Sequence, residues 1–477
     1  MNHFEMLIGG HFVGGPCDQS VAKTVSRTPW TGAVIGTAAE ASWAECEMAL
    51  IAAHEAKSNW QATPCEDRSA LLKRISSLIR ERKGELAQLL VDEVGKPISF
   101  ARAEVDRIAI TFELSAEAAL SSRSFAADLS YDPRGVHFSA EVMRVPRGAV
   151  FGIVPYNWPF NLAAHKLGPA LASGNTIILK GSPLSPLCHL ALARIFADAG
   201  TPDGVANFLL CEPREAERIA GDPRIDGISF TGSPAVGWHL KERFPKKPIW
   251  LELGGNAFAV VASKTRDDLW EILAKSAFGY AGQICISLQH LLIHESLYEA
   301  AVDALIDSTN QIACADPTLE DTICGPMIHE QAAQKAIYRI AEAARSGATI
   351  LAGSNCTGNR MSPTLLSDVP LETELMTEEI FAPVLTIEPY SNLGEAIGRI
   401  NASTYGIHAS LFSADEDAIQ KFARECHVGG VVINDAPTIR FDSLPYGGVR
   451  ESGFGREGIS AAIREFTEEK SVVRRKF

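Results

Sequence analysis

The sequence predicts an α/β fold built around a largely parallel sheet. From about residue 147 onward, short apolar runs alternate with segments of helical periodicity, and this alternation is typical of βαβ units. Hydrophobic residues make up 46% of the chain and charged residues 21%, the ordinary balance of a globular protein. A chain of 477 residues is too long for one hydrophobic core, so we expect two or three domains.

The expected elements follow one another in chain order. Leucine and isoleucine recur at helical spacing over residues 67–94, which predicts one long amphipathic helix. Four strands of a parallel sheet follow, each with a helix after it. The strands span 149–154, 176–179, 205–210 and 227–230, and the helices span 161–172, 187–199, a short segment after 210, and a segment from about Ala235. Ligands of such sheets bind beyond the carboxyl ends of the strands.

Composition excludes several classes of partner. A net charge of −14 argues against nucleic acid or an anionic membrane as a partner. The ten cysteines form no C-x-x-C pair and show no Cys/His spacing that suits zinc, which indicates no metal site and free thiols in a reducing cytoplasm. No signal peptide is visible in residues 1–6, and no apolar stretch approaches the ~18 residues of a membrane span.

Two short segments carry the residue types of a nucleophile and a base. Cys285 ends the run Gly282-Gln283-Ile284-Cys285, and Glu252 stands before two glycines in Leu251-Glu252-Leu253-Gly254-Gly255. A thiol can attack a carbonyl, and a carboxylate can activate the water that later removes the acyl group. Each signal is weak by itself, because an isolated cysteine is more often buried and inert.

Two glycine-rich segments compete as a phosphate-binding turn. Residues 453–458 match G-x-G-x-x-G, but they lie outside a βαβ unit and only nineteen residues follow, so a tight turn is favoured. Phe230-Thr231-Gly232-Ser233 follows a strand and opens a helix, so its backbone N–H groups and the Ser233 hydroxyl could hold a pyrophosphate. Lys180 ends another strand and could reach a ribose or phosphate, or be merely solvated.

Together these segments resemble the NAD(P)-dependent aldehyde dehydrogenase superfamily. The resemblance runs from near the N-terminus to Phe477. Further markers are Pro-Tyr-Asn-Trp-Pro-Phe at 155–160, Glu-Glu-Ile-Phe-Ala-Pro at 378–383 and Pro-Tyr-Gly-Gly at 445–448. Segments 232–238 and 433–438 are similar to the lactaldehyde and succinate-semialdehyde dehydrogenase-like bacterial branch.

The resemblance implies a role for each reacting residue. Cys285 would form a thiohemiacetal and then a thioester with the aldehyde, while Asn157 and the Cys285 backbone N–H hold the oxyanion. Glu252 would activate the water that hydrolyses the thioester. Lys166 and Glu468 would pair and relay protons from that base. No metal is implied, because the oxyanion hole plays the electrophilic role.

The resemblance also implies a site for NAD or NADP. The expected residues are Pro155, Tyr156, Lys180, Ser182, Pro183, Phe230, Gly232, Ser233, Gly254, Glu379 and Phe381. Among them Glu379 would bind the nicotinamide ribose, Lys180 the adenosine ribose and Ser233 the pyrophosphate. Pro183 stands where NAD-specific relatives often carry a Glu that binds the ribose 2′-hydroxyl, so we expect NADP to be used alongside NAD or in preference to it.

The expected substrate positions are partly polar. They are Trp158, Asn161, His165, Ile284, Ile286 and Arg440. An unpaired buried polar group costs about 1–3 kcal/mol, so Asn161, His165 and Arg440 favour a small hydroxyaldehyde or a semialdehyde. In the alternative reading His165 only packs and Arg440 is solvated or paired at an interface, and the enzyme is a broad-range one that prefers apolar aldehydes.

Two other classes remain open. A CoA-acylating aldehyde dehydrogenase would pass the acyl group to CoA instead of water, but relatives of that class generally lack the Glu found here at position 252. A non-catalytic structural homologue is disfavoured because Cys285, Asn157 and Glu252 are all present.

The family fold implies three parts. A doubly wound cofactor domain would cover residues 1–129 and 148–253, and a catalytic α/β domain residues 254–465. A β oligomerisation arm would comprise residues 130–147 and 466–477. Pairing of arm strands across subunits would hide an exposed sheet edge, so we expect a homodimer or homotetramer.

Overall fold

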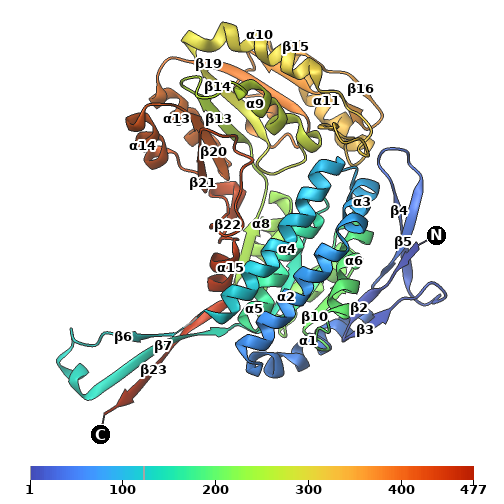
Figure 1. The fold of residues 1–477 in the computed structure, drawn as a ribbon, viewed down its shortest axis with the longest axis vertical. Coiled ribbons are helices and arrows are strands. Elements are labelled where there is room, and N and C mark those ends of the chain that lie inside the picture. Colours follow the sequence, from blue (N-terminus) through green and yellow to red (C-terminus); the bar gives the residue numbers. More distant parts are fainter. Residues whose placement is uncertain (1, 122–123, 477) are drawn as a thin grey trace.

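A computed structural model describes residues 2–121 and 124–476. Some predicted segments include residues 1, 122–123 or 477, and these positions lie outside the described residues. Figure 1 shows two sheet-centred units, one above the other, and a narrow arm that projects from the lower unit, with the C-terminus at the end of the arm strand β23. The α/β fold predicted from the strand–helix alternation is confirmed.

The lower unit is built on an eight-stranded sheet in the order β22-β12-β11-β8-β9-β10-β2-β3. The five strands from β12 to β10 are parallel, and they are buried because helices cover both faces. Among these parallel strands, β8 comes first in the chain and lies in the middle. The chain then adds β9 and β10 on one side and β11 and β12 on the other, so the switch point, where the strand order reverses, lies between β8 and β11. The strands are β8 (Ala149–Ile153), β9 (Thr176–Lys180), β10 (Ala206–Leu209), β11 (Gly227–Thr231), β12 (Ile249–Glu252), β22 (Gly453–Phe454), β2 (Met6–Ile8) and β3 (His11–Val13).

Nine helices belong to this unit in the described chain: α1 (Trp43–Ala62), α2 (Cys65–Glu81), α3 (Lys83–Val94), α4 (Ile98–Leu120), α5 (Pro159–Ser173), α6 (Pro186–Asp198), α7 (Pro213–Gly221), α8 (Pro234–Arg243) and α15 (Ile459–Glu465). The single helix predicted over 67–94 is wrong, because the chain breaks at Arg82 between α2 and α3. Gly84 in the first turn of α3 disfavours an unbroken helix, and the Arg82 guanidinium pairs with Asp198 at 2.5 Å.

The upper unit is built on a seven-stranded sheet in the order β15-β18-β19-β14-β13-β20-β21. Its strands are β13 (Ala257–Val261), β14 (Leu288–His294), β15 (Thr349–Ala352), β18 (Thr364–Ser367), β19 (Val384–Tyr390), β20 (His408–Phe412) and β21 (Gly430–Ile433). Its helices are α9 (Leu269–Phe278), α10 (Glu295–Gln311), α11 (Glu330–Arg345), α12 (Glu374–Thr377), α13 (Leu393–Ala402) and α14 (Glu416–Glu425), and a small hairpin joins β16 (Cys356–Thr357) to β17 (Arg360–Met361).

The arm is a three-stranded antiparallel sheet in the order β23-β7-β6. It consists of β6 (Ser124–Ala127), β7 (Phe138–Pro146) and β23 (Thr467–Arg475), and β23 pairs with β7 along its whole length. The arm sheet therefore begins at Ser124, before the predicted boundary at residue 130. A separate sheet near the N-terminus joins β1 (Asn2–Phe4), β5 (Val34–Glu40) and β4 (Ala22–Arg27).

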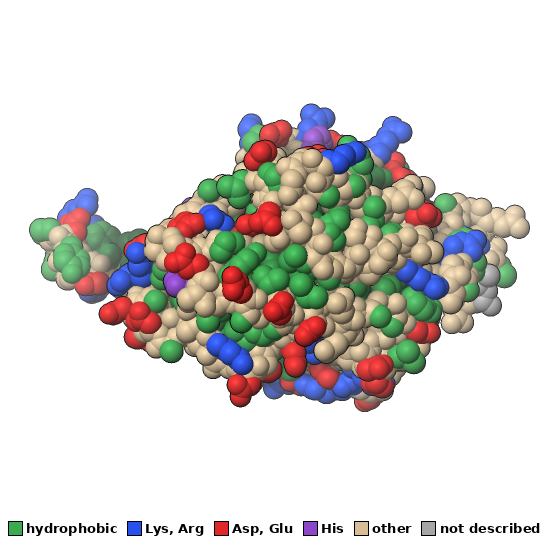
Figure 2. Space-filling model, turned by 90° about the horizontal axis from the view of Figure 1, so that it is seen from above, with side chains coloured by type: hydrophobic (Ala, Val, Ile, Leu, Met, Phe, Trp, Pro, Cys, Tyr) green, Lys and Arg blue, Asp and Glu red, His purple; other side chains and the backbone are tan. Residues whose placement is uncertain are grey.

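Two features of the structure concern nucleic acid and membranes as partners. On the face seen in Figure 2, acidic and basic side chains are interspersed among apolar ones and form no continuous basic patch. Within residues 2–121 and 124–476, no helix is both long enough and apolar enough to cross a membrane.

Candidate active site

Two cavities meet at Cys285. The first has a volume of about 330 Å³ and lies at the carboxyl ends of β8, β11 and β12, where the switch point predicts a ligand site. The second has a volume of about 210 Å³ and lies beneath α4 and α5. Asn157, Leu162 and Cys285 line both cavities. The thiol therefore faces a ligand in either cavity.

The loop before Cys285 has an unusual backbone. Tyr280, Ala281 and Gly282 have φ of 51°, 54° and 67°, a left-handed run that is strained for residues other than glycine. A Cβ on Gly282 would lie 2.2 Å from the carbonyl oxygen of Ala382, and a Cβ on Gly255 would lie 2.5 Å from that of Cys285. The glycines of both motifs are therefore required by close backbone approach at the thiol.

Gln283 holds this loop from the side. Its Nε2 donates to the carbonyls of Tyr280 and Pro326 at 3.2 and 3.3 Å, and its Oε1 accepts from Ile328 N at 2.9 Å and from the Tyr156 hydroxyl at 3.1 Å. A buried amide with all these partners specifies one conformation. The position of Cys285 therefore depends on a side chain two residues earlier.

Cys285 is partly buried, and the charged groups of Glu379, Arg440 and Glu252 are near enough to affect its thiol. Burial raises the pKa of its thiol to about 11, against an opposing effect of the hydrogen bond with the Tyr446 hydroxyl, whose oxygen lies 3.0 Å from Sγ. The thiol is therefore protonated near neutral pH and has to lose its proton during attack. In the sequence Tyr446 is only one residue of the Pro-Tyr-Gly-Gly marker at 445–448, and its contact with Cys285 in the structure adds it to the site.

Asn157 lies beside the thiol as predicted. Its Nδ2 donates to the carbonyl of Gln283 at 2.9 Å, which orients the amide and leaves the second N–H of Nδ2 free to donate to an oxyanion at Cys285. Because such donors act when they are oriented in advance, the geometry is compatible with the predicted oxyanion role.

Glu252 ends β12 and lies behind the cavities, outside the walls of both. A Cβ on Gly447 would come within 2.7 Å of its Oε1, and its Oε2 accepts no hydrogen bond from the described residues. Burial, and then the negative charge of Glu457, raise the pKa of Glu252 well above its usual value. Its carboxyl has to turn toward Cys285 before it can act as the predicted base.

The predicted Lys166–Glu468 pair is wrong. Lys166 is buried, and its Nζ bonds to Glu457 Oε1 at 3.1 Å, to Ser229 Oγ at 3.1 Å and to Thr231 Oγ1 at 2.7 Å. Glu468 lies instead on the exposed arm strand β23 and pairs with Arg147 at 3.3 Å. The partner of Lys166, Glu457, lies in the G-x-G-x-x-G segment at 453–458, for which the sequence predicts a tight turn and no phosphate binding.

Arg107 and Arg440 supply positive charge to the second cavity. Trp158, Asn161, Ile284, Ile286 and Arg440 line this cavity as predicted, and Arg107 from α4 joins them. The Arg440 Nη2 lies 3.3 Å from Glu457 Oε2 and its Nε 3.6 Å from Asp442 Oδ1. The alternative that Arg440 is solvated or paired at an interface is contradicted, because Arg440 is buried and paired within the chain.

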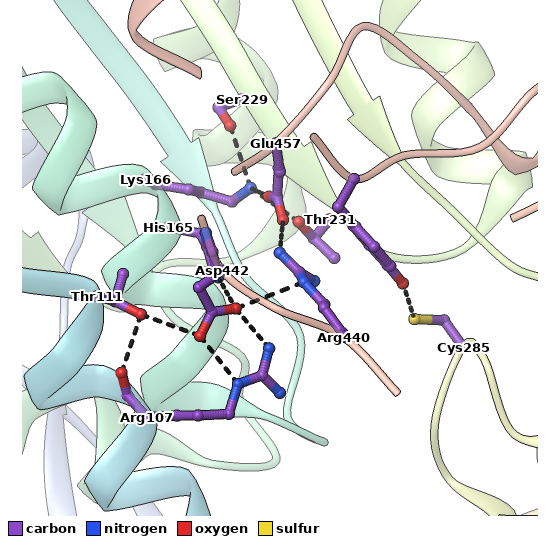
Figure 3. A network of polar contacts seen from close by, with 11 residues as sticks. Arg107, Thr111, His165, Lys166, Ser229, Thr231, Cys285, Arg440, Asp442 and Glu457 are labelled. Atoms are coloured by element: carbon purple, nitrogen blue, oxygen red, sulfur yellow. Dashed lines mark hydrogen bonds and ion pairs between the residues drawn. The ribbon is translucent and has the colours of Figure 1, made fainter. Parts of the chain in front are cut away.

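His165 does not face this cavity, so its predicted substrate contact is wrong. Its Nε2 lies 2.8 Å from Asp442 Oδ1 (Figure 3). Asp442 also accepts two hydrogen bonds from Arg107, at 2.9 and 2.5 Å. Burial and then the charge of Arg440 lower the pKa of His165, so the ring is neutral near pH 7.

The network in Figure 3 carries an excess of positive charge. Its cations are Arg107, Lys166 and Arg440, and its carboxylates are Asp442 and Glu457. Burial raises the pKa of Glu457, but neighbouring charges outweigh this effect and lower it to about 2. Within the group drawn, three cationic side chains therefore stand against two carboxylates.

The first cavity is lined by residues expected to bind the nicotinamide ribose and the pyrophosphate. Glu379 lines it, accepts a hydrogen bond from Gly255 N at 3.0 Å, and has a pKa that burial raises to about 7. Gly232 and Ser233 line it at the start of α8, where backbone N–H groups attract phosphate. Lys335 and Arg339, not foreseen from the sequence, also line this cavity.

The remaining predicted cofactor residues divide into two groups. Pro155, Tyr156, Gly254 and Phe381 line the first cavity. Lys180, Ser182, Pro183 and Phe230 lie outside its wall, and burial lowers the pKa of Lys180 at the end of β9. No group of three or more His, Cys, Asp or Glu side chains in the described part of the chain is placed to hold a metal ion.

Replacement of Tyr446 tests the electrostatics of the thiol. Because the Tyr446 hydroxyl stabilises the thiolate, Tyr446→Phe should raise the pKa of Cys285 and slow its alkylation several-fold at pH 8. The rate of iodoacetamide labelling at Cys285, followed by peptide mass spectrometry from pH 7 to 11, measures this change. A labelling midpoint that is unchanged or lower in the variant would contradict it.

Comparison with known proteins agrees with the site. The profile of the Aldehyde dehydrogenase family matches residues 18–472. The 3-sulfolactaldehyde dehydrogenase of Priestia megaterium is 35% identical over 467 residues, 97% of each chain. The NADP⁺ succinate-semialdehyde dehydrogenase of Deinococcus radiodurans is 34% identical over 93% of each chain.

Solved structures lead to the same family. Aldehyde dehydrogenase 21 of Physcomitrella patens, in complex with the product succinate, superposes with a TM-score of 0.97 at 33% identity and covers 99% of this chain and 98% of its own. The NADP-bound glyceraldehyde-3-phosphate dehydrogenase of Bacillus halodurans has a TM-score of 0.94 at 31% identity, with full coverage of both chains. The chain therefore belongs to the aldehyde dehydrogenase family and is an NAD(P)-dependent aldehyde dehydrogenase.

Proposed function

We propose that this enzyme oxidises a short aldehyde that carries a carboxylate or sulfonate at its other end. The observation that carries this proposal is the second cavity, which has Cys285 on its wall together with the guanidinium groups of Arg107 and Arg440. Guanidinium groups suit carboxylate and sulfonate oxygens because they donate parallel hydrogen bonds. The cationic side chains of the network, which outnumber its carboxylates, favour an anionic substrate.

The cavity also limits the length and polarity of the substrate. Its volume of about 210 Å³ is below the roughly 300–1,000 Å³ of pockets for drug-sized ligands, so a short chain fits. Trp158 and Asn161 line this cavity, and the Trp158 Nε1 donor and the Asn161 Oδ1 acceptor have no partner among the described residues. A substrate hydroxyl group that reached them could accept from Trp158 Nε1 and donate to Asn161 Oδ1, whereas an acid oxygen could only accept from Trp158 Nε1.

In the proposed reaction the Cys285 thiol gives its proton to solvent, and its sulfur attacks the aldehyde carbon. Asn157 Nδ2 and the Cys285 backbone N–H donate to the carbonyl oxygen as it becomes negative. Tyr156, Ser233 and Glu379 line the cavity that would hold NAD or NADP, and the bound cofactor would supply the hydride acceptor. Glu252 turns toward the thioester and takes a proton from water while the water oxygen attacks the thioester carbon, so that the acid and the Cys285 thiolate are released. The Lys166–Glu457 pair lies next to Glu252 and sets the charge around it.

Two relatives support this substrate class by their names, which describe a sulfolactaldehyde and a succinate semialdehyde as their substrates. Glu252 supports hydrolysis over transfer to CoA. We further infer a homodimer or homotetramer formed through the β23-β7-β6 arm, and a cytoplasmic location in keeping with ten free cysteines. Release of the free acid in the absence of CoA tests the hydrolytic step.

Replacement of Arg107 tests the substrate class. Arg107→Gln should lower kcat/KM for succinate semialdehyde about 10- to 100-fold, because a hydrogen bond to a charged group contributes about 1.5–3 kcal/mol. The effect on butanal, a neutral aldehyde with the same number of carbons, should stay below about threefold. Steady-state assays of NADPH or NADH formation give both values.

A matched control comes from the same helix. Arg102 is exposed on α4 and pairs with Glu320, so Arg102→Gln should leave both aldehydes unaffected. Equal losses for succinate semialdehyde and butanal in Arg107→Gln, or a preference of the native enzyme for butanal, would contradict the anionic substrate.

The pH dependence of hydrolysis tests the carboxyl pair. Glu252 acts as a base only when it is ionised, so turnover should fall as the pH is lowered through its raised pKa. Glu457→Gln removes the neighbouring negative charge that raises this pKa, so the acidic limb of kcat should move to lower pH. An acidic limb that is unmoved or shifted to higher pH would contradict this electrostatic coupling.

Cofactor preference is tested beside Lys180. Pro183 leaves no carboxylate at that position, but the exposed Glu212 lies near enough for its charge to raise the pKa of Lys180 against the effect of burial. We expect use of NADP, with a kcat/KM ratio of NADP to NAD that rises at least threefold in Glu212→Gln and stays constant in the control Glu215→Gln. A native ratio a hundredfold in favour of NAD would contradict NADP use.

A further inference from the structure

A pair of neighbouring thiols, Cys314 and Cys324, lies in the upper unit, away from Cys285. Cys314 and Cys324 are partners in a parallel β-bridge, and Ala315 N donates to the Cys324 carbonyl at 3.0 Å. Both sulfurs lie near one atom, the carbonyl oxygen of Gly325, at 3.3 and 3.7 Å. Adjacent strands are about 4.7–4.9 Å apart, within the Cα separation of about 4.4–6.8 Å that a disulfide spans.

The two thiols differ in access. Cys314 is half-buried and lines a cavity of about 560 Å³, together with Cys356 and Arg360. Cys324 is buried behind it. An exposed thiol in front of a buried one is the usual arrangement of an attacking and a resolving cysteine.

The surroundings also favour the thiolate at Cys314. A hydrogen bond from the Cys324 thiol lowers the pKa of Cys314, and the positive charge of Arg360 adds to this effect, against an opposing effect of burial. At Cys285, in contrast, burial raises the pKa. Peroxide reacts with thiolates, so Cys314 should be oxidised ahead of the catalytic thiol.

We propose that Cys314 and Cys324 form a thiol–disulfide modification site that hydrogen peroxide reaches through the cavity beside Arg360. The Cys314 thiolate attacks one peroxide oxygen, the O–O bond breaks, and sulfenic acid and hydroxide form. The Cys324 sulfur then attacks the sulfenic sulfur, its proton joins the departing oxygen as water, and the S–S bond forms. Two thiols and one peroxide thus give one disulfide and two waters.

The bridge is directly connected to the catalytic loop. Ile323 O accepts from Tyr280 N at 2.9 Å, and the segment after Cys324 supplies Pro326 O and Ile328 N as partners of Gln283. Any backbone shift that accompanies the S–S bond therefore acts on the loop that positions Cys285. We expect oxidation to lower kcat severalfold, and dithiothreitol to restore it.

The experiment is disulfide mapping in the native enzyme. The reduced protein is treated with limiting hydrogen peroxide, blocked with N-ethylmaleimide and cleaved at acidic residues. Asp316, Glu320 and Asp321 lie between the two cysteines, so the fragments stay together only if the disulfide has formed. We expect the Cys314–Cys324 link at a rate at least tenfold above that of the link between Cys46 and Cys211.

Cys46 and Cys211 provide an internal control, because both are buried and the Cys211 thiol, followed by burial, raises the pKa of Cys46. Cys356→Ser should leave the link and its rate unchanged. In Cys324→Ser a sulfenic acid should accumulate at Cys314 and be trapped by dimedone. Oxidation of Cys285 while Cys314 and Cys324 are still free, or no dimedone adduct at Cys314 in Cys324→Ser, would overturn the proposal.

Discussion

The close contact between the Gly254–Gly255 turn and the Cys285 loop is the constraint on which the site depends. These segments belong to different sheets: the turn leads from β12 of the lower sheet to β13 of the upper one, and the loop precedes β14. No side chain fits between Gly255 and the Cys285 carbonyl. The thiol is thereby held where the ends of β8, β11 and β12 open into the cofactor cavity.

The two cavities that meet at Cys285 are lined by different elements. The first cavity, which we expect to hold the cofactor, lies on the side of β11 and α8. The second cavity, which we propose holds the substrate, lies on the side of α4 and α5. Cys285 and Asn157 are shared, so the reacting carbon is accessible from both sides while the rest of each ligand stays in its own cavity. Pre-positioning of this kind lowers the entropic cost of reaction.

Buried charge is the second organising feature. Unpaired charges in a protein interior are strongly unfavourable, and here Arg107, Lys166 and Arg440 are held by Asp442 and Glu457. The same carboxylates connect the substrate cavity to the region of Glu252. Charge at the substrate end and protonation of the base are therefore physically linked through Arg440, which contacts both carboxylates.

Local sequence was enough to predict the strand–helix alternation and to single out Cys285, Glu252 and Asn157, because each belongs to a short segment at one strand end or turn. The structure brings Cys285 and Asn157 to the same two cavities, and the roles of nucleophile, base and oxyanion donor stay predictions. The partners of these groups were decided by tertiary structure. Lys166 pairs with Glu457 and not with the predicted Glu468, and His165 pairs with Asp442 and does not line the cavity. Arg107 lines the second cavity although it lies on a helix fifty residues before Asn157 in the sequence. Side-chain partners follow from packing between distant segments, and residue order along one chain does not encode that packing in any local pattern.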